Sequence, residues 1–237
     1  MRSLARFLQK TELFADLSED TIQQEILPHG YFQEYAKGQF LIEPQQRIET
    51  VGIILSGKVH ILHMFADGFQ SLMGDLMTGE ITGADLVCTR SRISPYHAVA
   101  VAATRVFYLP AHILTRQGIL AENVRLKCLD RLLMLISNEN MKKEYRLAIL
   151  SQKGLRERIL IYLHMQAARR GKNTFAIPFS REELAAFLCV NRSALSHELS
   201  LMRQEGLIQF RKNIFTVCEK DDSYQTPEKH PLSAGEE

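Results

Sequence analysis

The chain has 237 residues, of which 46% are hydrophobic and 24% are charged, and its formal net charge is +2. This length predicts one large domain or two ordinary ones, and the apolar content excludes a wholly disordered chain. No uninterrupted apolar run approaches the length of a transmembrane helix, and the N-terminal segment lacks the apolar stretch of a secretory signal. We therefore expect a cytoplasmic protein with no membrane partner.

The small net charge is the sum of three unlike segments. Residues 1–149 carry equal numbers of acidic and basic residues, whereas residues 150–220 carry 12 basic and 6 acidic residues, and residues 221–237 have a net charge of −4. A basic segment of this size predicts contact with a polyanion. The acidic segment contains few apolar residues, so we predict a flexible tail there.

The first part of the chain is predicted to change from helix to strand near residue 31. A helix within residues 13–31 can be capped by Ser18 and ended by Pro28. Turn signals then separate short apolar runs, among them Asp67-Gly68, which is typical of a hairpin. The predicted strands include residues 40–42, 51–55, 59–62 and 99–109. Strands this short and this regularly spaced predict a β-sandwich or barrel.

A long helix is predicted next, over residues 111–150. Apolar and polar residues follow a 3–4 repeat along it, ending at Leu150 and containing Leu126, Leu129, Leu133, Ile136, Asn140, Lys143 and Leu147. A heptad seam of this kind is typical of a helix that packs lengthwise on a second copy, and its polar members can fix the register. Packing on its own domain is the alternative, because Leu132 and Leu135 widen the stripe.

The basic segment carries the clearest motif. After a predicted helix over residues 155–168 and a strand over 174–178, Ser180 and Glu183 form a capping box at the start of a short helix. Asn191 can cap a second helix that runs to about residue 204. Two further strands flank the basic tip Arg211-Lys212-Asn213. Two short helices joined by a turn and followed by a basic hairpin are the pattern of a winged helix-turn-helix.

This pattern suits duplex DNA, because the major groove admits one helix and side chains at its N-terminal end can reach base edges. We predict that Arg192 reads guanine and that basic residues around it contact phosphates. The predicted DNA-contacting residues are Arg181, Asn191, Arg192, Ser193, Ser196, His197, Arg211 and Lys212. The alternative is an ordinary helical hairpin with solvated charges.

The sequence FSREELAAFLCVNRSALSHELSLMRQEGLIQFRKNIFTV, residues 179–217, resembles the DNA-binding end of the CRP/FNR family of bacterial transcription regulators. Residues 35–43, residues 53–59 and Asp67-Gly68 resemble the sensor domain of that family. The resemblance implies an α+β fold with a jelly-roll sensor domain at 1–118, a dimerisation helix at 119–150 and a winged helix-turn-helix domain at 151–220, before the acidic tail at 221–237.

The resemblance also implies partners and a signal. The expected partners are a second copy of the chain and double-stranded DNA with a palindromic operator, and RNA polymerase is a further candidate. Members that bind cyclic nucleotides carry a Gly-Glu pair and a later Arg followed by Ser or Thr, whereas here Ala84 follows Gly83 and the arginine position falls near Ser94. We therefore expect an effector other than cyclic AMP, or none. The predicted effector site consists of Gly83, Ala84, Asp85, Cys88, Arg90, Arg92 and His97.

No cofactor is predicted. The four cysteines, Cys88, Cys128, Cys189 and Cys218, include no CxxC pair, which favours reduced thiols and argues against an iron–sulfur cluster. Haem is not expected, although His60, His63, His97 and Cys88 are potential axial ligands. Cys88 lies near two arginines, so a lowered pKa and a redox role are one hypothesis, and an inert side chain is the other.

We predict that the protein is not an enzyme. A cupin-like metal site needs His and carboxylate ligands on facing strands, but His60 and His63 point to opposite faces of one straight strand. No other acidic or histidine residue has the spacing to complete such a site. The remaining alternative to a regulator is a ligand-binding jelly roll whose basic C-terminal domain is an interaction module without a regulatory role.

Overall fold

The computed structural model describes residues 2–65 and 70–218. The chain divides into two compact units, Met1–Lys142 and Lys143–Glu237, and helix α5 (Glu122–Leu150) contributes to both. The predicted hairpin turn at Asp67-Gly68 and the predicted acidic tail lie outside the described residues. The predicted domain boundaries at residues 118, 150 and 220 stay a prediction.

The chain begins with a helix that the sequence analysis missed. This helix, α1 (Arg2–Gln9), has one apolar face, on which Ala5 and Leu8 are fully buried. A helical segment follows as α2 (Glu19–Thr21), η2 (Ile22–Ile26) and η3 (Leu27–His29), after the single turn η1 (Glu12–Phe14). The predicted cap of this segment is confirmed, because the Ser18 hydroxyl accepts a hydrogen bond from the Thr21 amide at 3.1 Å.

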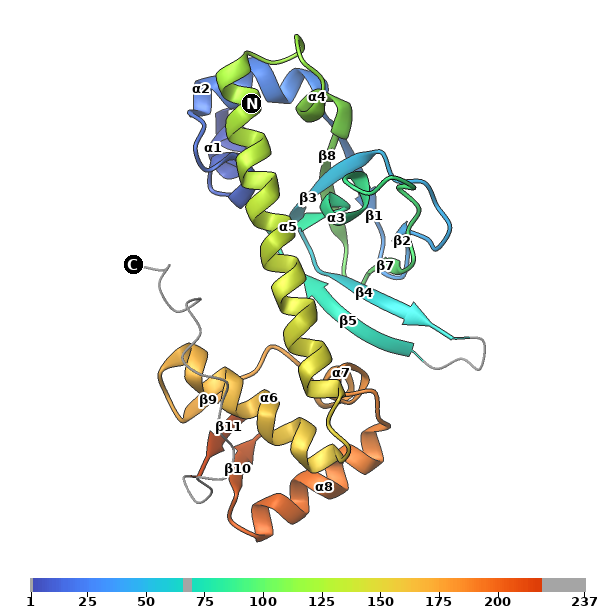
Figure 1. Ribbon diagram of the computed structural model, residues 1–237, viewed down its shortest axis with the longest axis vertical. Coiled ribbons are helices and arrows are strands. Elements are labelled where there is room, and N and C mark those ends of the chain that lie inside the picture. Colours follow the sequence, from blue (N-terminus) through green and yellow to red (C-terminus); the bar gives the residue numbers. More distant parts are fainter. Residues whose placement is uncertain (1, 66–69, 219–237) are drawn as a thin grey trace. The chain divides into compact units, whose positions relative to one another are not determined.

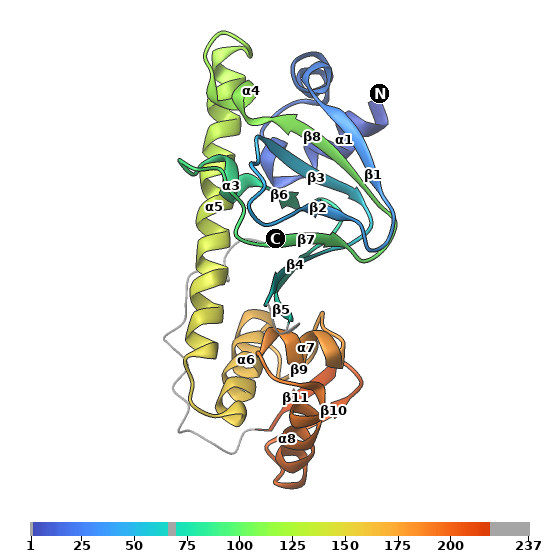
Figure 2. The ribbon, with the colours of Figure 1, turned by 90° about the vertical axis from the view of Figure 1, so that its right-hand side faces the viewer.

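Two four-stranded antiparallel sheets form the body of the first unit, in the orders β1-β8-β3-β6 and β2-β7-β4-β5 (Figure 2). Their strands are β1 (Tyr31–Tyr35), β2 (Phe40–Ile42), β3 (Thr50–Ser56), β4 (Val59–Met64), β5 (Gln70–Leu76), β6 (Ile81–Thr82), β7 (His97–Ala100) and β8 (Thr104–Pro110). The predicted sandwich is confirmed. The single strand predicted at 99–109 is wrong, because the chain passes from one sheet to the other between β7 and β8.

The helix predicted at 111–150 is also interrupted. Helix α4 (Ala111–Thr115) ends before Gly118, which has a φ of +81°, and α5 starts at Glu122. A left-handed residue cannot continue the α-helical hydrogen-bond ladder, so the chain breaks there. Helix α5 runs along the sandwich (Figures 1 and 2) and buries Val124, Cys128 and Leu132 in its core. No helix in the described part of the chain is long and apolar enough to cross a membrane.

Up to residue 218, where its described part ends, the second unit holds three further helices and a small sheet. They are α6 (Leu155–Arg170), β9 (Thr174–Ala176), α7 (Arg181–Phe187), α8 (Arg192–Gln204), β10 (Ile208–Arg211) and β11 (Ile214–Val217), and the antiparallel sheet has the order β10-β11-β9. The core includes a cluster of three rings, with Phe179 5.0 Å from Phe187 and 6.2 Å from Tyr162 between centroids. The predicted winged helix-turn-helix is confirmed as a fold.

Both predicted helix caps of this unit are present. The Glu183 amide donates to the Ser180 hydroxyl at 3.2 Å, and the Glu183 carboxylate accepts from the Ser180 amide at 2.7 Å. The Asn191 side-chain oxygen accepts from the Ala194 amide at 2.8 Å. Each bond satisfies an amide at a helix start that has no partner within the helix. The local sequence therefore fixes where α7 and α8 begin.

We predict that Ser180→Ala lowers the free energy of unfolding by about 1 kcal/mol, because it removes the acceptor of the capping box. Chemical denaturation followed by circular dichroism measures this change. Ser200→Ala is the matched control, since the Ser200 hydroxyl donates to the Ser196 carbonyl inside α8 and alanine favours a helix interior. An equal loss in both variants would contradict the role of the cap.

Candidate nucleic-acid interface and effector site

The N-terminal part of α8 presents a polar face to solvent. Arg192, Ser193, Ser196 and His197 are exposed, whereas the opposite face is fully buried through Leu195, Leu199 and Met202. The 3.6-residue period of the helix separates the two faces. The buried face fixes the helix on its own domain, so the polar face is available to enter a groove.

Asn191 positions this polar face. Its side-chain oxygen accepts from the Ala194 amide and also from the Ser193 hydroxyl at 2.9 Å. These two bonds orient the first turn of α8. The structure therefore shows a capping role for Asn191, while its predicted contact with DNA stays a prediction.

The wing carries positive charge without a carboxylate partner. Arg211 and Lys212 are exposed at the turn between β10 and β11, and Lys212 has a left-handed φ of +55°. Among the described residues, neither these two side chains nor Arg192 forms an ion pair. By contrast, Arg156 of α6 is paired with Glu198 at 2.7 Å and Glu205 at 2.6 Å. The positive charges of this unit that have no ion-pair partner among the described residues thus include those of the wing, at Arg211 and Lys212, and that of Arg192 at the start of α8.

Arg181, predicted as a phosphate contact, is also a support of the wing. Its guanidinium lies over the Phe210 ring at 4.9 Å and the Phe215 ring at 5.4 Å, and it donates to the Lys212 carbonyl at 3.3 Å. Partial burial lowers the pKa of Arg181. These contacts hold the turn between β10 and β11 against the start of α7. Sequence reasoning missed this role because the contacting residues lie about thirty positions away.

A buried arginine that no sequence pattern indicated lies behind the helix-turn-helix. Arg146, near the end of α5, is only 6% exposed and donates to the Phe187 carbonyl at 3.2 Å. Its guanidinium lies 5.1 Å from the centre of the Phe187 ring and 3.9 Å from the Cys189 sulfur. Burial lowers the pKa of Arg146. The contact holds the C-terminal end of α7, where carbonyl groups favour a cation.

The predicted effector residues lie on several elements. Gly83, with a φ of +79°, precedes the short helix α3 (Ala84–Val87), and a side chain at Gly83 would collide with the Thr50 carbonyl. Cys88 and Arg90 are exposed beyond α3, and Arg92 lies 4.0 Å from Glu49. The last member, His97, lies on β7, and its ring is 5.4 Å from that of Phe40. The predicted members therefore lie on α3, on the loop after it and, for His97, on a strand of the sheet β2-β7-β4-β5.

A hydrogen-bond network joins α3 to the following loop. The buried Tyr96 donates its hydroxyl proton to the Asp85 carboxylate at 2.9 Å. Ser94, which is fully buried, donates to the Tyr96 carbonyl at 2.8 Å and accepts from the Tyr96 amide at 3.2 Å. Burial and the neighbouring Asp85 raise the pKa of Tyr96. The region that holds the phosphate-binding arginine in cyclic-nucleotide members therefore has its own internal partners here.

Comparison with known protein families matches a segment of each unit to a domain family. Residues 32–117 match the cyclic nucleotide-binding domain family, and residues 157–221 match the Crp-like helix-turn-helix domain family. The chain belongs to the CRP/FNR family of bacterial transcription regulators. The transcriptional activator protein FnrA of Stutzerimonas stutzeri is 25% identical over 178 residues, which are 73% of this chain and 70% of that protein.

Two further relatives of this CRP/FNR chain are similar over most of its length. Electron transport regulator A of Shewanella oneidensis is 22% identical over 188 residues, covering 77% of this chain and 73% of that protein. The solved structure of CLP, a c-di-GMP responsive global regulator of Xanthomonas campestris, has a TM-score of 0.66 at 17% identity and covers 86% of this chain and all of that one. This structural likeness shows the shared fold.

Of the two hypotheses for Cys88, the structure favours the inert side chain. Partial desolvation of the thiol raises its pKa, and the opposing charge of Arg92 is a smaller influence. A raised pKa reduces the thiolate fraction at neutral pH, and the thiolate is the reactive form. Two arginines lie near this cysteine in the sequence. Their positions alone did not decide whether their charge, which lowers the pKa of the thiol, or its desolvation, which raises the pKa, is the larger effect.

We predict that Arg181→Gln destabilises the second unit by about 1 kcal/mol, because it removes the contacts with Phe210 and Phe215. Arg211→Gln, on the exposed side of the same wing, should change the free energy of unfolding by less than about 0.5 kcal/mol. Denaturant titration of both variants measures the difference. If the two variants were equally stable, the stacked guanidinium would have no structural role.

Proposed function

We propose that the protein is a homodimeric, sequence-specific DNA-binding regulator of transcription whose activity responds to a small molecule other than cyclic AMP. The exposed polar face at the start of α8 carries this proposal, since it lies on a helix whose opposite face is fully buried. The two curated relatives above are named as regulators, not enzymes, which agrees with a role without catalysis.

In the proposed complex, the N-terminal turns of α8 enter the major groove. Arg192 can donate two parallel hydrogen bonds to guanine, and Ser193, Ser196 and His197 lie on the same exposed face, within reach of neighbouring base edges or phosphates. Arg211 and Lys212 contact the sugar–phosphate backbone, which adds affinity without sequence choice. Their lack of ion pairs within the described residues supports this division of roles.

The dimer is proposed from the exposed stripe of α5. Leu126, Leu133 and Leu147 of the 3–4 repeat are 53%, 65% and 63% exposed. The buried residues of α5, such as Val124 and Leu132, lie on another face. Ile136 of the repeat packs partly against the sandwich core, but that packing leaves the three leucines exposed. Two copies of α5 that pair along this stripe would present two α8 helices to a palindromic operator.

The effector is proposed to differ from cyclic AMP because of the network around Tyr96. Ala84 offers no carboxylate for a ribose hydroxyl, and Ser94 is buried and fully engaged with the Tyr96 backbone. The Asp85 carboxylate would oppose an anionic phosphate nearby. The raised pKa of Cys88 argues against a redox signal at this cysteine.

We predict that the protein selects a palindromic motif from a pool of random DNA duplexes. Arg192→Glu should abolish the choice of motif, because the carboxylate is repelled by phosphate and cannot donate to guanine. Lys212→Ala should weaken binding to all sequences similarly, since it removes a phosphate contact, and it should make the salt dependence less steep by about one unit of slope.

Titration of selected and scrambled duplexes with each variant distinguishes these effects. If selection returned no motif and affinity followed salt alone, the specific regulator would be refuted. The same result would favour the alternative that the basic domain is an interaction module attached to a ligand-binding jelly roll.

We predict that Leu133→Glu converts the dimer to a monomer at micromolar concentration, because it places charges in the centre of the apolar seam. Met134→Glu is the matched control, since Met134 is 50% exposed but lies outside the 3–4 repeat. Sedimentation of the wild type and both variants measures the oligomeric state. A wild-type monomer, or an equal response of both variants, would refute the proposed seam.

A further inference from the structure

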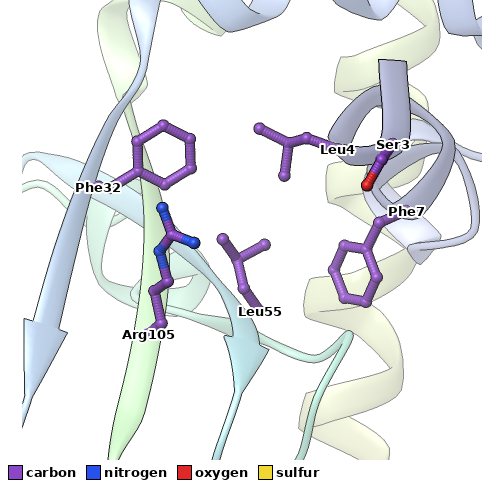
Figure 3. Close-up of a pocket in the computed structure, with 6 residues that line it drawn as sticks. All are labelled: Ser3, Leu4, Phe7, Phe32, Leu55 and Arg105. Atoms are coloured by element: carbon purple, nitrogen blue, oxygen red, sulfur yellow. The ribbon is translucent and has the colours of Figure 1, made fainter. Parts of the chain in front are cut away.

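A cavity of about 310 Å³ lies between α1 and the sheet that contains β1, β3 and β8 (Figure 3). Its lining is formed by Ser3, Leu4, Phe7, Phe32, Leu55 and Arg105. None of these residues belongs to the predicted effector site or to the DNA-binding face. The volume falls at the lower end of the range of about 300–1,000 Å³ that small-molecule sites occupy.

The body of this cavity is apolar. Leu4 and Phe7 are three residues apart on α1, so they project from the same side of the helix, and Leu55 of β3 faces them across the gap (Figure 3). All three side chains are only partly buried. The helix itself is anchored by other residues, since Ala5 and Leu8 are fully buried and Arg6 is paired with Glu19 at 2.9 Å. The three lining side chains are therefore available for a further apolar contact.

Arg105 is the charged residue among those that line the cavity. The Arg105 guanidinium lies 4.8 Å from the centre of the Phe32 ring and points into the space that Leu4 and Leu55 line (Figure 3). Its ion pair with Glu34 is long, at 3.6 Å, and both side chains are more than half exposed. A guanidinium has five N–H donors in a planar fork that matches a carboxylate, so Arg105 can accept a second anion on its inner side.

We propose that this cavity binds an amphipathic carboxylate, a fatty acid of medium chain length, with its carboxylate on Arg105 and its chain against Leu4, Phe7 and Leu55. The stacked Phe32 ring pre-orients the guanidinium, which reduces the entropy lost on binding. The nearby Glu34 carboxylate disfavours a doubly charged phosphate, so a single negative charge is the better match. This proposal does not depend on DNA binding.

Calorimetric titration of the full chain with decanoate, below the concentration at which it forms micelles, tests the proposal. We expect one saturable site per chain and a loss of about tenfold or more in affinity for Arg105→Gln, because a charge-assisted hydrogen-bonded pair is removed. Arg47→Gln is the matched control, since Arg47 is an exposed arginine paired with Glu49 at 3.1 Å in the same unit, and it should bind decanoate like the wild type. The neutral analogue 1-decanol should bind wild type and Arg105→Gln equally weakly.

A second variant keeps the test independent of Arg105. Leu4→Glu should reduce decanoate affinity by a similar factor, because it places a carboxylate among the apolar lining and beside the guanidinium. Thermal unfolding without decanoate verifies that each variant is folded. No saturable binding to the wild type, equal affinity in wild type, Arg105→Gln and Leu4→Glu, or tighter binding of decyl phosphate than of decanoate would each overturn the proposal.

Discussion

The continuity of α5 is the constraint on which the rest of the structure depends, because this one helix supplies core residues to both compact units. Val124 and Cys128 are buried in the sandwich unit, and Arg146 is buried in the winged-helix unit against Phe187. Within the sandwich unit, the helical period directs neighbouring side chains to different faces of α5. Burial of Val124 and Cys128 on one face therefore leaves Leu126 and Leu133 exposed on another.

The basic residues of the second unit divide into two groups that composition alone cannot separate. One group is structural and includes Arg146, Arg156 and Arg181, whose guanidinium groups join helix to helix or helix to wing. The other group lies exposed at the start of α8 and on the wing. Part of the net charge that indicates a polyanion thus stabilises the domain, and only the exposed part can act on a partner.

The sandwich unit has the fold of the family, with polar contacts of its own around Tyr96. Packing of two sheets needs only alternating apolar residues, so the sandwich does not require charged groups at Ala84 or Ser94. The hydrogen bond to Asp85 satisfies the hydroxyl of the buried Tyr96. The same scaffold, covered by α1, also forms the cavity beside Arg105.

The sequence by itself determined the features that depend on neighbours within about four residues. The capping box at Ser180 and the cap at Asn191 follow from such local contacts. Apolar runs between turn signals also indicated several strands and the order of elements that is typical of the family. Only the tertiary structure decided the change of sheet between β7 and β8, the stacking of Arg181 on Phe210 and the burial of Arg146. These features join residues that are distant in sequence, so only the folded chain brings their side chains together. The fold also sets how far burial shifts the pKa of the arginine side chains involved.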